Sequence, residues 1–83
     1  MNEILGKEII SIVADISGYE EEEIHPESDL QKDLEVDSIK AIEIAVAIEK
    51  KYRVSVRDED IPNLITVRQV VDLIADLMKQ KGQ

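Results

Sequence analysis

Apolar residues recur along this 83-residue chain at the three- and four-residue intervals of amphipathic helices. The first stripe predicts a helix that begins at the cap residue Asn2 and ends at about Ile16 or Ser17, before Gly18 as the C′ residue. Its apolar positions are Leu5, Ile9, Ile12, Val13 and Ile16. Nothing in this helix indicates chemistry, so we interpret it as scaffold.

The last helix of the chain has the most regular pattern. Thr66 and Gln69 match a capping box, with the threonine at the N-cap and the glutamine at N3. Lys79 and Lys81 suit the negative end of the helix dipole, and Gly82 follows them. The predicted apolar stripe consists of Val67, Val70, Val71, Ile74, Leu77 and Met78.

The middle helix, predicted from Ser38 to Lys51 or Tyr52, has three faces when it is drawn at about 100° per residue. Its core face holds Ala41, Ile44, Ala45, Ile48 and Tyr52, and its charged face holds Lys40, Glu43, Ala47, Lys50 and Lys51. A second apolar stripe of Ile39, Ile42 and Val46 lies beside Ser38. Because a surface helix needs only one apolar face, this stripe must meet the neighbouring loop, a ligand or a partner.

The first connection, residues 19–36, is long and polar. The four acids from Glu20 to Glu23 predict a solvated loop, and Pro26 excludes a helix around it. We expect the apolar residues of this segment to anchor it to the core, namely Ile24, Leu30, Leu34 and Val36.

In the second connection, Asp58 is expected to cap a single helical turn that runs through Ile61 and is limited by Pro62 and Asn63. The whole chain is therefore predicted to be all-α. We expect a small four-helix bundle, made of three main helices and one short helix between the second and third.

Composition narrows the classes of function. A chain of 83 residues fits a single domain, so residues 1–83 are expected to form one unit and to be monomeric. Nineteen acidic and ten basic residues give a net charge of −9, which repels nucleic acid and anionic membranes and favours partners with basic patches. Cysteine is absent, so any thiol must come from a prosthetic group. No signal peptide or transmembrane run is present, which predicts a cytoplasmic protein.

The side chains do not predict an enzyme. The sequence lacks a Ser-His-Asp pattern, a phosphate-binding glycine loop and a distinct carboxylate pair. Asp29, Asp33 and Asp37 recur every four residues, but the glycine and glutamate of a calcium loop are missing, so no metal site is predicted. The single histidine, His25, is interpreted as a loop side chain.

Ser38 has the properties of a serine that another enzyme modifies. It stands at a helix start, where side chains are exposed, and the expected Asp37 cap and Leu34 anchor would order the backbone around it. The positive end of the helix dipole would favour an attached anion.

The residues around Ser38 resemble the signature of acyl carrier proteins. The resemblance rests on Asp29-Leu30, Asp33-Leu34, Asp37-Ser38-Ile39, Ile42-Glu43 and Ile48-Glu49, and it extends over essentially the whole chain. It implies a four-helix bundle and a 4′-phosphopantetheine arm, taken from coenzyme A, on Ser38. The arm's thiol would hold an acyl cargo as a thioester and carry it between enzymes.

The same resemblance implies the partners. They are a phosphopantetheinyl transferase and acyl-processing synthase enzymes with basic docking patches. The expected partner-binding residues are Glu35, Ile39, Lys40, Ile42, Glu43 and Val46.

Two departures from the fatty-acid carriers bear on the pathway. Lys40 stands where most of them have an acid, and their second helix is more uniformly acidic than this one. Asp-Ser-Ile-Lys looks more like carriers of polyketide or polyunsaturated-fatty-acid synthases. Fatty-acid and polyketide biosynthesis, the cargo and the partner enzymes are therefore left open. The alternatives are an aminoacyl or D-alanyl carrier, which would share the fold and arm, and an unmodified acidic helical module that binds a basic partner.

Overall fold

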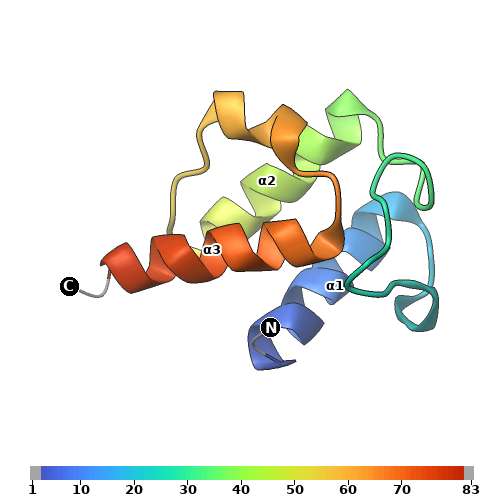
Figure 1. Ribbon diagram of the computed structural model, residues 1–83, viewed down its shortest axis with the longest axis horizontal. Helices are drawn as coiled ribbons and strands as arrows, with labels where there is room; N and C mark the ends of the chain where they lie inside the picture. The colour runs from blue at the N-terminus through green and yellow to red at the C-terminus, as the bar shows by residue number, and fades with distance from the viewer. Residues whose placement is uncertain (1–2, 82–83) are drawn as a thin grey trace.

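The computed structural model describes residues 3–81 as three α-helices and two short 3-10 helices (Figure 1). In chain order these are α1 (Glu3–Ser17), η1 (Glu21–Glu23), α2 (Ser38–Tyr52), η2 (Asp58–Asn63) and α3 (Val67–Lys81). The predicted all-α bundle is confirmed, with η2 as the short helix between α2 and α3. The expected cap Asn2 and the expected stop Gly82 lie outside the described residues.

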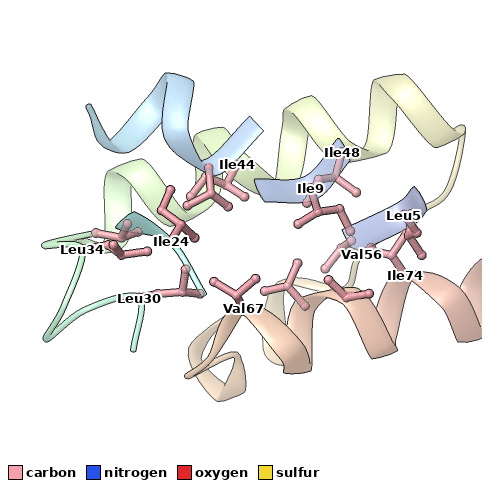
Figure 2. Close-up of a cluster of buried hydrophobic side chains, with 14 residues drawn as sticks. Leu5, Ile9, Ile24, Leu30, Leu34, Ile44, Ile48, Val56, Val67 and Ile74 are labelled. Carbon is pink, nitrogen blue, oxygen red and sulfur yellow. The ribbon is translucent and has the colours of Figure 1, made fainter. Parts of the chain in front are cut away.

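The core is aliphatic and lies where α1, α2, α3 and the first connection meet (Figure 2). The predicted anchors of that connection are all buried, so the loop is part of the core. One position departs from the periodicity, because Met78 is 39% exposed near the end of α3. The buried core residues are Leu5, Ile9, Val13, Ile24, Leu30, Leu34, Val36, Ile44, Ile48, Val56, Val67, Val70, Val71 and Ile74.

The helix ends follow local chemistry. Gly18 ends α1 with φ +86°, and its N–H donates to the Ala14 carbonyl at 2.9 Å. The Gln69 N–H donates to Thr66 Oγ1 at 3.2 Å, while Gln69 Oε1 accepts the Thr66 N–H at 3.1 Å, which confirms the capping box. α2 ends without a glycine, at Arg53 in the left-handed region with φ 56°.

The first connection is bonded to the start of α3. The Leu30 N–H donates to the Ile65 carbonyl at 2.8 Å, and the Arg68 N–H donates to the Pro26 carbonyl at 2.8 Å. Arg68 Nε also lies 2.6 Å from a carboxylate oxygen of Glu27. The connection thus supplies partners to backbone groups that a helix N-terminus leaves without intrahelical bonds.

The expectation for the short helix was wrong in two respects. Arg57, and not Asp58, is the N-cap residue, and its carbonyl accepts the Asp60 N–H at 2.9 Å. η2 also continues past Ile61 through Pro62 to Asn63. The proline removes only one donor from this short 3-10 segment, and Asn63 Nδ2 donates to the Glu59 carbonyl at 3.4 Å.

A hydrogen bond from the Tyr52 hydroxyl to Glu8 Oε1, 2.7 Å long, joins α2 to α1. Partial burial, together with this bond, raises the pKa of the Tyr52 phenol above its ordinary value of 10.0. A phenol whose pKa is raised by folding adds stability below pH 10, and this stability is lost as the pH rises through the folded-state pKa.

We therefore expect Tyr52→Phe to lower the free energy of unfolding at neutral pH and the difference from the wild type to shrink above pH 10. Urea unfolding of both proteins over this pH range measures the difference. A difference that stays constant to strongly alkaline pH would show that the phenol does not contribute through this bond.

Candidate functional site

The start of α2 is fixed by Asp37. This residue has an extended backbone, with φ −82° and ψ −177°, and is the N-cap. Its Oδ1 accepts the Lys40 N–H at 2.8 Å, and its carbonyl accepts the Ala41 N–H at 2.9 Å. Ser38 is thereby held as the first residue of the helix.

Ser38 is one of five serines in the chain, and within the described residues only Ser38 and Ser55 are exposed. Ser38 alone of these two lies at a helix N-terminus. Backbone N–H groups and the positive end of the helix dipole there stabilise a negative charge. An anion bonded to the Ser38 hydroxyl would therefore lie in a favourable field.

The chain approaches Ser38 through two buried anchors. Leu34 is 2% exposed and Val36 is 5% exposed, and the Val36 N–H donates to the Leu30 carbonyl at 2.8 Å. Glu35, between them, has φ +55°, a left-handed conformation that costs a non-glycine residue about 1–2 kcal/mol. Its carboxylate accepts a 2.6 Å hydrogen bond from the Tyr19 hydroxyl.

The aspartates that recur every four residues each accept hydrogen bonds from backbone N–H groups. Asp29 Oδ1 accepts from Gln31 and Lys32 at 3.0 and 2.8 Å, and Asp33 Oδ2 accepts from Asp29 at 2.8 Å. Together with the Asp37 cap, these bonds explain the spacing as turn chemistry. The spacing suggested only a metal motif in the sequence, and the turn role of Asp29 and Asp33 was not predicted. Within residues 3–81 no group of three or more acidic or histidine side chains could hold a metal ion.

An open groove of about 950 Å³ lies between the first connection, α2 and η2, and Ser38 is one of its lining residues. Ala41 and Ile42 line it from α2, and Ile61 and Ile65 line it from the second connection. Lys32 lies on the side of the first connection. Because the two connections form most of the wall, helical periodicity could not predict the groove.

The second apolar stripe of α2 is not covered by the loop. Ile39 is 68% exposed, Ile42 is 53% exposed and Val46 is 41% exposed. Glu35, Asp37 and Glu43 are exposed around this stripe, and Lys40 is half-buried. The structure thus places all the predicted site residues at one end and along one side of α2, with Glu35 and Asp37 in the loop before it.

Comparisons with known proteins agree with this geometry. Residues 7–74 match the family model described as a phosphopantetheine attachment site. A meromycolate extension acyl carrier protein of Mycobacterium leprae is 42% identical over 75 residues, which cover 90% of this chain and 65% of that protein. The acyl carrier protein of Acidothermus cellulolyticus is 35% identical over 68 residues, or 82% of this chain and 81% of that protein.

A solved structure shows the same fold. The solution structure of the apo doublet acyl carrier protein from prodigiosin biosynthesis matches with a TM-score of 0.77 and 30% sequence identity. The match covers 89% of this chain and 36% of that chain.

The protein is thus a small helical carrier with a phosphopantetheine attachment site. It belongs to the phosphopantetheine-binding acyl carrier protein family, whose members are carriers and not catalysts. The chain spans 65% of the length of the meromycolate extension acyl carrier proteins of Mycobacterium leprae and Mycobacterium bovis. In the described part of the chain, no helix is long and apolar enough to cross a membrane.

The two apolar faces of α2 make a prediction about stability. Val46 is 41% exposed, whereas Ile48 is 1% exposed and packs in the core. Ile48→Ala should lower the free energy of unfolding by about 2–5 kcal/mol, and Val46→Ala by no more than about 1 kcal/mol. Urea unfolding monitored by circular dichroism measures both. Equal losses in the two variants would place Val46 in the core.

Proposed function

We propose that Ser38 carries the 4′-phosphopantetheine arm and that the protein is an acyl carrier of fatty-acid or polyketide biosynthesis. The observation that carries this proposal is that Ser38 is exposed, stands at a capped helix start and lines a groove. The bound arm supplies a terminal thiol that can hold an acyl group as a thioester. The chain itself has no cysteine.

The residues of the chain give order to this site. Asp37 fixes the first turn of α2, and the buried anchors Leu34 and Val36 hold the segment that leads to it. The helix N-terminus stabilises the phosphodiester formed at Ser38. The apolar wall of the groove, which includes Ile42 and Ile61, supports the attached chain.

Membership in the family implies a phosphopantetheinyl transferase and synthase enzymes as partners. We propose that these enzymes contact the exposed stripe of Ile39, Ile42 and Val46 and that their basic patches are attracted by Glu35 and Glu43. Lys40 gives this face a mixed charge and selects among partners. In this proposal residues 1–83 act as a single, monomeric carrier domain, and the cytoplasmic location remains a prediction.

The names of two similar proteins support a cargo class. One relative is named for meromycolate extension and the matched structure belongs to a carrier from prodigiosin biosynthesis. Both names are compatible with acyl intermediates that are built on a carrier. No observation in the structure favours an aminoacyl cargo or an unmodified interaction module.

Replacement of the serine tests the attachment residue. Ser38→Ala should leave the helical circular dichroism unchanged and abolish the mass gain on treatment with coenzyme A and a phosphopantetheinyl transferase, because the side chain is exposed. Ser55→Ala, at the other exposed serine, is the matched control and should gain the full mass. A mass gain in the Ser38→Ala protein would show that the arm is attached to another residue.

The acidic residues near Ser38 make a second prediction. Glu43→Lys should slow arm transfer at low salt, because it reverses the charge that attracts a basic partner. The difference should shrink as salt shortens the Debye length from about 10 Å at 0.1 M to about 3 Å at 1 M. Asp76→Lys, at an exposed position of α3, controls for the change in net charge. Transfer rates equal to the wild type at every salt concentration would show that Glu43 does not guide partners.

A further inference from the structure

We propose that Tyr19 and Glu35 are positioning residues, which hold the segment before α2 so that Ser38 is presented for attachment of the arm. The inference rests on the proposed function of Ser38. It concerns a contact between the two ends of the first connection, and not a contact with the arm itself.

Glu35 has a backbone conformation that its residue type disfavours. Its neighbours Leu34 and Val36 are both buried, and the left-handed φ of +55° at Glu35 connects the two. Glutamate disfavours this region because its Cβ crowds the following carbonyl, whereas glycine adopts it freely. Something outside the backbone of Glu35 must therefore favour the observed conformation.

Tyr19 provides that contact. It follows Gly18 directly after α1, and its ring packs partly buried against the core. Its hydroxyl donates to Glu35 Oε2 at 2.6 Å, across 16 residues of sequence. The bond ties the beginning of the first connection to its end, one residue before the buried Val36.

The surroundings keep the hydroxyl in its donor form. The hydrogen bond to Glu35 raises the pKa of the Tyr19 phenol above its ordinary 10.0, and the nearby charges of Glu35, Glu23 and Asp33 act in the same direction. Tyr19 is therefore protonated at neutral pH and can donate to the carboxylate.

Without this bond, only the burial of Leu34 and Val36 and the bond from Val36 to Leu30 oppose a change at Glu35, so the right-handed and extended regions are occupied more often. Such a change displaces the residues that follow Glu35, namely Val36, Asp37 and Ser38. A smaller fraction of the free carrier would then present Ser38 in the arrangement that the transferase binds. The apparent KM for the carrier would rise by the inverse of that fraction.

A double-mutant cycle of Tyr19→Phe and Glu35→Gly separates this role from others, with steady-state arm transfer as the measurement. Tyr19→Phe should raise the KM for the carrier about twofold to tenfold, the range expected for one hydrogen bond, with kcat unchanged. In the Glu35→Gly background the same change should have an effect of less than about twofold, because glycine adopts a positive φ without help. Both members of that second pair lack the carboxylate, so charge attraction does not differ between them.

Local order gives an independent measurement on the same proteins. In Tyr19→Phe, the amides of Val36 and Lys40, which donate to Leu30 and Asp37, should exchange hydrogen faster than in the wild type. The amide of Val71 in α3 should be unchanged, and circular dichroism should show every variant fully folded. A purely structural role of Tyr19 would instead accelerate exchange throughout the core.

The proposal is overturned if Tyr19→Phe has the wild-type KM, or if its effect is equally large in the Glu35→Gly background. If the proposed function itself is wrong, the mass gain changes instead of the KM. The wild type would then gain no arm, or the Ser38→Ala protein would still gain it. The two outcomes are therefore distinguishable in one set of reactions.

Discussion

The burial of the first connection is the constraint on which the rest of this structure depends. A polar segment of eighteen residues, 19–36, would be mobile if nothing held it, yet Ile24, Leu30, Leu34 and Val36 are buried in the core between the helices. Backbone bonds from this segment to Ile65 and Arg68 also supply partners to the start of α3. Because Asp37 and Ser38 follow Val36 directly, the same anchors that complete the core also place Ser38, the proposed attachment residue.

The division of α2 into faces explains how so small a protein combines stability with recognition. Ile44, Ala45 and Ile48 bury one face in the core, and the second apolar stripe is left to solvent beside Ser38. In the proposed function the chain supplies order, exposure and charge at this site, and the arm attached to Ser38 would supply the reactive thiol. Such a division suits a carrier, whose own side chains must present a cargo without reacting with it.

The sequence predicted the three long helices well, because apolar periodicity and helix-end residues are local signals. Thr66 and Asp37 cap helix N-termini as predicted, and Gly18 ends α1. The N-cap of η2 was predicted at Asp58 instead of Arg57, because three acidic residues in succession, 58–60, are all plausible caps. The end of η2 was also misplaced, because a 3-10 segment tolerates Pro62. The sequence could not predict the groove or the Tyr19–Glu35 bond, since both join segments that are distant in sequence. The roles of Asp29 and Asp33 were also missed, although their spacing was noticed, because turn bonds depend on the fold of the loop.

The proposed function requires that the arm is attached to one serine, which is held at the start of α2. Fragmentation mass spectrometry of the wild-type protein, after treatment with coenzyme A and a phosphopantetheinyl transferase, tests it most directly. The chain has five serines, at positions 11, 17, 28, 38 and 55, and peptide fragments can distinguish them. The added mass should reside entirely on Ser38. An arm found on Ser55, on any other serine or on no residue would contradict it.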